Sequence, residues 1–483
     1  MRDGVWEVFQ YDLGRPWPDL PLELSGARPD LATWARELGI RDNQRFLIGP
    51  AGFPDLRVNA FLASPRMRSL AETTQRDYAH SLALWLNFLH VTDQVWWEAG
   101  EDDAEEFKFW RLTDPENDQT VGTSAFSKDL AACKKFYTWI GGRYSGVADP
   151  FAQISFPAAK RGADVKWLDP AAVVRWRDLG LRGRLPSGRR DRSWRGRNDQ
   201  RDAAFVDGLY GTGLRLTEWA SVMLPELPQL EVGRDYYMCE LADMCAKGGN
   251  GHSYWIPRSA LTAVRAYTEG ARARAVREAQ AAGRYEQVPG VRVVAGEPGR
   301  ESVVVPDRAG VMVTRAWALI RPSLRRSLFR STPAGLEPLS LWLNEDGMPR
   351  DPHGWHHTFE AANRRIAALG LDGFTCTAHM HRHSFALRWF SIGKLVRGYQ
   401  VAHLSEKQTN DFCDQFGDTW HLVQTMLGHK LVETTKDVYL EPFRRLEVEQ
   451  LLAHAEGFPV AQFMADAFVS HPRVRTDPLA GTR

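Results

Sequence analysis

The chain has 483 residues, of which 43% are hydrophobic and 25% are charged, and its formal net charge is +1 at pH 7. This length predicts two or three domains, and the composition is that of a soluble globular protein. No apolar run of about 18 residues could span a bilayer, and the acidic, aromatic N-terminus lacks the apolar core of a signal peptide. We therefore expect a cytoplasmic, nucleoid-associated or otherwise soluble protein with no membrane partner.

The cysteines are odd in number, are scattered along the chain and form no CxxC pair. This usage argues against a disulfide framework and against a zinc site. Two of them could meet across a hairpin, but a pair of reduced, half-buried thiols at Cys239 and Cys245 is favoured.

The first part of the chain predicts a helical domain over residues 66–158. It follows a proline-rich N-terminal extension, residues 1–65, whose role the sequence does not indicate. A periodic helix starts near Thr73, which can cap it, and further helices are expected across Asp103–Trp110 and from about Ser124 to Ile140. The stripe of the first helix consists of Tyr78, Leu82, Trp85, Leu86 and Leu89.

A second domain is expected over residues 165–455, so that the fold is mainly α with a small β-hairpin or sheet. A helix over Asp199–Tyr210 leads into a tight glycine turn. Strands at Tyr236–Leu241 and His252–Ile256 flank a glycine-rich turn, which is a hairpin signal. A later helix is expected over Gly354–Leu369, whereas residues 270–338 show no assignable pattern.

An arginine-rich loop precedes the Arg215 helix. A nearly neutral chain can still bind nucleic acid through a local basic face. A solvated loop is the alternative, but the position of this segment favours contact with a DNA backbone. The candidates are Arg189, Arg190, Arg192, Arg195 and Arg197, with Arg182 and Arg184 beside them.

Four short motifs carry residues suited to attack on a phosphodiester. Arginine holds a phosphate bidentately and stays charged, histidine and lysine move protons, and tyrosine can form a covalent link. Each also has a plainer interpretation: a surface ion pair, an exposed turn lysine or a core histidine. The motifs are Gly-Thr-Gly-Leu-Arg215-Leu-Thr-Glu218, the Lys247 turn, His379-Met-His-Arg382, and Leu-Gly-His429 followed by Tyr439.

In this order the motifs resemble the tyrosine recombinase, or phage integrase, family, which cuts and rejoins DNA. The resemblance covers about residues 73–452. It implies a site-specific recombinase that works through a 3′-phosphotyrosyl intermediate, without metal, ATP or another cofactor. The implied catalytic residues are Arg215, Lys247, His379, Arg382, His429 and the nucleophile Tyr439, with Glu218 orienting the site.

The resemblance also implies how the domains are used. Residues 66–158 would be a SAM-like core-binding domain, and residues 165–455 the catalytic domain. The partners would be double-stranded DNA, a homotetramer on two DNA sites, and an accessory protein or partner recombinase. The tail, residues 456–483, would dock on a neighbouring subunit through Phe458–Phe468, unless it folds back on its own domain.

Three features depart from the family pattern. His381 stands where a leucine is typical, and the spacing between Arg382 and His429 is long, with Gln400–Asp418 as the expected insertion. Tyr439 lies one position farther from His429 than usual, and one residue rotates a helical side chain by about 100°. Two rivals remain: a nicking enzyme similar to type IB topoisomerases, and a catalytically silent DNA-binding regulator.

Overall fold

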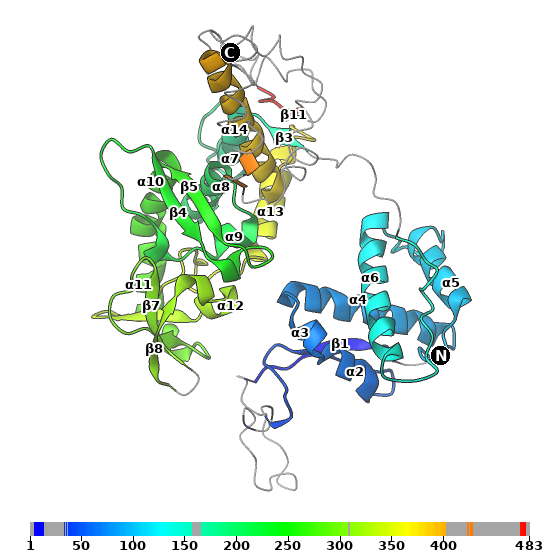
Figure 1. Ribbon diagram of the computed structural model, residues 1–483. Coiled ribbons are helices and arrows are strands. Elements are labelled where there is room, and N and C mark those ends of the chain that lie inside the picture. Colours follow the sequence, from blue (N-terminus) through cyan, green and yellow to red (C-terminus); the bar gives the residue numbers. More distant parts are fainter. Residues whose placement is uncertain are drawn as a thin grey trace. The chain divides into compact units, whose positions relative to one another are not determined.

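The structure is a computed structural model that describes residues 4–13, 33, 35, 37–156, 166–307, 310–401, 423, 424, 426, 427 and 474–479, without the side chains of 394–401. It divides into two compact units, Met1–Arg161 and Gly162–Arg483. Helices predominate in the described residues, and the strands form small sheets of two or three strands (Figure 1). The expected mainly α fold class is confirmed.

Three long helices supply most of the described helical residues of the first unit: α4 (Glu72–Val91), α5 (Glu101–Leu112) and α6 (Thr123–Gly141). Their apolar stripes meet in one core, as the periodicity predicts. In that core the indole of Trp85 donates to the Tyr137 hydroxyl at 3.0 Å, and that hydroxyl donates to the Trp96 carbonyl at 2.7 Å. Both buried polar groups therefore have partners, as a close-packed core requires.

The segment before residue 66 also belongs to this core, through Leu47, Val58 and Phe61. Each of its elements is only four to seven residues long, too short for periodicity to reveal. The elements are β1 (Glu7–Gln10), the antiparallel β2 (Arg45–Ile48), α2 (Leu56–Leu62) and α3 (Pro65–Arg68).

The second unit packs its helices around an aromatic core. The rings of Phe205 and Trp355 stack with centroids 3.5 Å apart, and the Trp342 indole donates to the Trp219 carbonyl at 3.1 Å. The helices are α7 (Pro170–Gly180), α8 (Asp199–Thr212), α9 (Leu216–Ala220), α10 (Arg258–Tyr267), α11 (Ala273–Ala281), α12 (Pro322–Arg325), α13 (Gly354–Ala368) and α14 (Ala378–Val401).

The predicted hairpin is present. Strand β4 (Tyr236–Leu241) pairs antiparallel with β5 (His252–Pro257), so that Leu241 lies opposite His252. The hairpin packs against α8 and α10 (Figure 1). The connecting turn, residues 242–251, carries Lys247, and its Ala242 and Cys245 are buried in the core of the unit.

Residues 268–338, which the sequence left largely unassigned, contain a π-helical turn (Thr268–Arg272) and several short strands. Strands β10, β9 and β6 form a sheet in that order, and β7 and β8 form a hairpin. The strands are β6 (Arg292–Val293), β7 (Ser302–Pro306), β8 (Met312–Ala316), β9 (Leu328–Thr332) and β10 (Gly335–Pro338). Short 3-10 helices occur at Leu224–Glu226, Asp243–Cys245, Tyr285–Gln287 and Trp317–Leu319.

The end of the chain folds back on the second unit. Strand β11 (Val474–Arg475) pairs in parallel with β3 (Trp167–Leu168). The carboxylate of Asp477 is 3.0 Å from the Arg175 guanidinium, which it binds in a bidentate pair. The segment Phe458–Phe468, expected to dock on a neighbouring subunit, lies outside the described residues.

Two expectations about the chain as a whole can be compared with the structure. Four described cysteines, Cys133, Cys239, Cys245 and Cys376, are free thiols, so Cys239 and Cys245 do not pair across the hairpin. These two thiols are buried rather than half-buried as expected, and burial raises the pKa of each to about 11. Within the described ranges, no helix combines the length and apolar character needed to cross a membrane.

Candidate functional site

The buried carboxylate of Glu218 is the centre around which the first motif folds. Helix α8 ends at Gly213, whose φ of 69° is left-handed and whose Cα faces the Phe385 ring too closely for any side chain. Arg215 then begins α9. Its backbone N–H donates to one oxygen of Glu218 at 2.8 Å, and its guanidinium donates to the other at 2.8 Å.

This arrangement settles which ion pair Arg215 makes. The pair with Glu218 expected as the plainer interpretation exists, but it is not a surface pair, because Glu218 is fully buried while the Arg215 side chain is 25% exposed. The buried carboxylate thus fixes the position of the Arg215 side chain, which remains partly exposed at the surface.

Arg382 comes to the same carboxylate from helix α14. Its Nη1 donates to the Gly213 carbonyl at 2.6 Å and lies 4.0 Å from Glu218 Oε2. Its Nη2 donates to the carbonyl of Leu427 at 2.7 Å. The side chain is fully buried, so these carbonyls fix the guanidinium plane beneath the surface of the site.

Lys247 joins from the β4–β5 turn. Its backbone N–H donates to Glu218 Oε1 at 3.3 Å, across 29 positions of sequence. The residue is exposed, as the plainer interpretation of a turn lysine also expects. However, the contact with Glu218 attaches this turn to the carboxylate that already binds Arg215.

His379 lies in the first turn of α14, on the same helix as Arg382. Its ring meets the His383 ring edge-on at a centroid distance of 4.3 Å. Partial burial lowers its pKa, and the positive charges of Arg382, Arg215 and Lys247 lower it further. The imidazole is therefore neutral at neutral pH and able to accept a proton.

The charges at the site do not balance. Burial on its own would raise the pKa of Glu218, but the charges of Arg382 and Arg215, with their hydrogen bonds, outweigh this and lower it. One carboxylate thus faces two cations, Arg215 and Arg382, and the charge of Lys247 also acts on the neighbouring His379. Such an excess of positive charge favours an anion with about one to two negative charges, as a phosphate carries.

His252 is a member of this cluster that the sequence interpretation missed. Burial lowers its pKa, the charges of Arg382 and Arg215 act in the same direction, and Glu218 and the backbone at Asn250 oppose them. Both ring nitrogens are buried, and among the described residues only the backbone at Asn250, in the same turn, offers one of them a hydrogen bond. A signal was available, because side chains alternate along a strand and His252 has the parity of the buried Tyr254 and Ile256.

His381 has the packing role that its position in the motif suggests. It is fully buried near the rings of Trp176 and Phe359, and its Nε2 lies 3.4 Å from the Cys376 sulfur. Burial lowers its pKa to about 3, so the ring stays neutral. It is thus a core group and takes no part in the charge cluster.

Two predicted catalytic residues, His429 and Tyr439, lie outside the described residues, as do positions 402–418 of the expected insertion. Leu427, two positions before His429, is described. Its side chain is fully buried, and its carbonyl accepts the hydrogen bond from Arg382. The structure therefore brings together Arg215, Glu218, Lys247, His379 and Arg382 from three separate segments.

The arginine-rich loop is exposed and ordered. An isolated antiparallel bridge joins Arg184 to Arg190, and Arg365 anchors the loop by an ion pair with Asp191 at 2.9 Å. Arg197 pairs with Glu345 at 2.8 Å, whereas Arg195 donates only to a carbonyl of the loop itself. The loop arginines that form no ion pair with a described residue are Arg184, Arg189, Arg190, Arg192 and Arg195.

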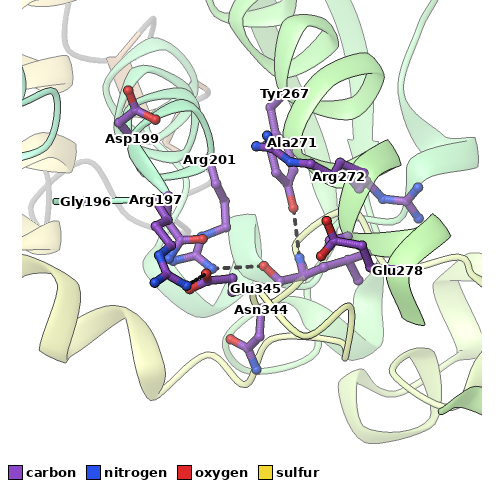
Figure 2. Close-up of a pocket in the computed structure, with 14 residues that line it drawn as sticks. Gly196, Arg197, Asp199, Arg201, Tyr267, Ala271, Arg272, Glu278, Asn344 and Glu345 are labelled. Carbon is purple, nitrogen blue, oxygen red and sulfur yellow. Dashed lines mark hydrogen bonds and ion pairs between the residues drawn. The ribbon is translucent and has the colours of Figure 1, made fainter. Parts of the chain in front are cut away.

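A polar hollow of about 470 Å³ lies at the other end of α8 (Figure 2). Arg197, Glu345 and Tyr267 line it, and the dashed lines in Figure 2 include the pair between Arg197 and Glu345. Helix α8 has 14 residues and so spans about 20 Å between this hollow and the Glu218 site. The hollow is a separate feature beside the arginine-rich loop.

In the described residues, no group of three or more histidine, cysteine, aspartate or glutamate side chains is arranged to hold a metal ion. The charged groups of the site are instead guanidinium, ammonium and a single carboxylate, with a neutral imidazole beside them.

No family model and no curated protein matches the sequence. Among solved structures, the chain is similar to XerH site-specific recombinase bound to difH substrate, with 12% identity, a TM-score of 0.42, and coverage of 84% of this chain and 86% of that one. It is also similar to the Tn1549 transposon integrase, residues 82–397, in complex with circular intermediate DNA, with 14% identity, a TM-score of 0.40, and 79% and 94% coverage.

A third similar structure is the integrase from mycobacterium phage Brujita, with 12% identity, a TM-score of 0.24, and 80% and 92% coverage. All three are recombinases or integrases. At such identities and TM-scores, the function has to be argued from the site itself.

Proposed function

We propose that this protein is a tyrosine-type site-specific DNA recombinase that cleaves and rejoins DNA through a 3′-phosphotyrosyl intermediate. The observation that carries the proposal is the convergence of Arg215, Lys247 and Arg382 on one buried carboxylate, with His379 beside them. The separated motifs that the sequence identified as catalytic thus supply one anion-attracting cluster.

Each described residue has a role in the proposed reaction. Arg215 and Arg382 neutralise the non-bridging oxygens of a DNA phosphate as charge develops on them. The Nη2 group of Arg382 donates to the Leu427 carbonyl in the structure. The backbone at Leu427 must therefore shift before this N–H can donate to a phosphate oxygen instead. Glu218 fixes both guanidinium groups.

The proton transfers balance as follows. Tyr439 forms a bond from its oxygen to phosphorus and gives its proton to the neutral His379. The bond from phosphorus to the 5′-oxygen breaks, and that oxygen takes a proton from the Lys247 ammonium group. His429 donates a hydrogen bond to the phosphate, and rejoining reverses these transfers. The phosphodiester bond energy is kept in the phosphotyrosine, so no ATP is required.

The arginine-rich loop is proposed to bind the DNA backbone. Arg189, Arg190 and Arg192 are exposed and have no ion-pair partner in the described residues, so phosphates meet no competing carboxylate there. The first unit is proposed as the core-binding domain for the same duplex, in the cytoplasm. The proposed assembly is a homotetramer on two DNA sites, in which Phe458–Phe468 docks on a neighbouring subunit.

A covalent-capture experiment tests the function without knowledge of the target sequence. The protein is incubated with a pool of nicked duplexes of randomised sequence, and adducts that survive detergent are sequenced. Wild-type protein should give adducts in EDTA, because arginines take the role of a cation. Tyr439→Phe should give none while retaining DNA binding, since only the nucleophilic oxygen is lost.

The outcomes separate the rivals. Binding without any wild-type adduct would indicate a silent regulator, and cleavage that needs magnesium would indicate another class of nuclease. Adducts that rejoin only their own strand, never a second duplex, would indicate a nicking enzyme of the topoisomerase kind.

A further inference from the structure

His252 is the group near the site that the proposed reaction does not use. It is the first residue of β5 and ends the turn that carries Lys247, five positions earlier. Both nitrogens of its imidazole are buried, and the backbone at Asn250 can pair with only one of them, which leaves the other without a partner in the described residues. Leaving such a group unpaired costs about 1–3 kcal/mol, so it requires an explanation beyond packing.

The turn between Lys247 and His252 is held tightly at its His252 end. The Gly251 N–H donates to the Asp243 carboxylate at 2.8 Å. A side chain on Gly251 would come within 2.3 Å of the Leu241 carbonyl oxygen, so only glycine fits this close approach. His252 therefore follows a fixed point in the backbone, which limits where its ring can go.

The other end of the turn is held by the site. The Lys247 N–H binds Glu218 Oε1, the oxygen that also accepts from the Arg215 guanidinium. Glu218 and the two site arginines are the charged groups that act on His252. The imidazole thus lies within electrostatic range of the carboxylate that holds the Lys247 backbone.

These observations support one role. We propose that His252 is a positioning residue for Lys247: its imidazole supports the turn between Glu218 and β5, and gains a further hydrogen-bond partner when a DNA phosphate draws Lys247 inward. The inference rests on the proposed function, and it deepens that function by naming how the proton donor for the leaving 5′-oxygen is held.

A sulfur substitution isolates this step. The duplex recovered by covalent capture is made twice, with oxygen or with sulfur as the bridging 5′-atom at the cleaved bond. A thiol has a pKa of about 8.5, so sulfur leaves as a thiolate without a donated proton. A defect in the placement of Lys247 should therefore appear with the oxygen duplex and disappear with the sulfur duplex.

The variants are His252→Phe, which keeps a ring but no nitrogen, and His252→Gln, which restores an N–H donor. We expect His252→Phe to form adducts with the oxygen duplex at least about 10-fold more slowly than wild type, as part of the effect of general acid catalysis. With the sulfur duplex it should match wild type, and His252→Gln should recover most of the rate with oxygen. Ser253→Ala, the next residue on the strand, bonds to Glu240 outside the site and serves as the control.

The outcomes distinguish this inference from the proposed function. A His252→Phe rate within twofold of wild type on the oxygen duplex, or an equal defect on both duplexes, would overturn the positioning role alone. Absence of any wild-type adduct would overturn the proposed function and this inference with it. Thermal unfolding of each variant shows whether it is folded. If His252→Phe is not folded, the rates of His252→Gln on the oxygen and sulfur duplexes decide between these outcomes.

Discussion

Arg382 Nη1 lies 4.0 Å from Glu218 Oε2, and neither side chain has any exposed surface. The same carboxylate binds Arg215 through two hydrogen bonds. Two guanidinium groups therefore depend on one buried anion. Because an unpaired buried charge is costly, Glu218 is needed to keep both arginines in place before any substrate binds.

Glu218→Gln should lower the free energy of unfolding by about 3 kcal/mol, the scale for breaking a buried ion pair from one side. Urea denaturation at pH 7 measures this value. The control is Glu231→Gln. Glu231 forms an exposed ion pair with Arg234 at 3.1 Å, so this substitution should lower the free energy of unfolding by less than about 1 kcal/mol. An equal loss of unfolding free energy in the two variants would mean that the buried ion pairs of Glu218 stabilise the protein no more than an exposed pair does.

The same variant should change the pH dependence of stability. Because the pKa of Glu218 is lowered on folding, its contribution is complete above its unfolded value of about 4.3 and is lost as the pH falls through the folded value. Wild-type protein should therefore lose more stability than Glu218→Gln between pH 5 and pH 3. If the free energies of unfolding of the two proteins fall in parallel over this pH range, the pKa of Glu218 is not lowered on folding.

Arg215→Ala and Arg382→Ala should each slow adduct formation by about 10²-fold or more, the scale for removing a preorganised charge donor. Arg215 is partly exposed and Arg382 is buried, so only Arg382→Ala should also lower the melting temperature strongly. Single-turnover kinetics on the captured duplex measures the rates. A rate within a fewfold of wild type would remove that arginine from the reaction.

Arg190→Ala should weaken binding to any duplex and leave the rate of the bound complex unchanged. Each lost phosphate contact reduces the slope of log affinity against log salt by about 1, so the slope identifies the kind of contact. Titrations at several salt concentrations give this slope. Arg234→Ala, an exposed arginine paired with Glu231, is the control and should leave it unaltered.

The tail offers a test of contacts within and between chains. Ending the chain before Val474 removes β11 and the pair between Asp477 and Arg175, so the protein should melt at a lower temperature. Because β11 pairs with β3 of its own chain, this loss should not depend on protein concentration.

Phe463→Asp should behave in the opposite way. It alters the segment proposed to dock on a neighbouring subunit, so binding to one DNA site should persist while two-site complexes become rarer. Gel-shift assays with one and two sites measure both. If both variants act alike, the two parts of the tail have a single role.

The sequence by itself determined the elements whose signal is local. The apolar stripes of α4 and α6 repeat with the helical period, and the hairpin signal around Lys247 needs only the strands on either side. His379 and Arg382 are three positions apart, so a helix places them on one side without reference to the rest of the chain. These predictions follow from short-range geometry.

Tertiary structure decided what long-range packing brings together. Arg382 binds the Gly213 carbonyl across 169 positions, and β11 pairs with β3 from the far end of the chain. The strands of residues 285–338 are two to five residues long and find partners only through the sheet. Likewise, strand parity indicates that His252 faces inward, but only the tertiary structure brings it within electrostatic range of Glu218. This proximity arises because α9, α14 and the hairpin all pack against α8, and burial then lowers the pKa of the imidazole.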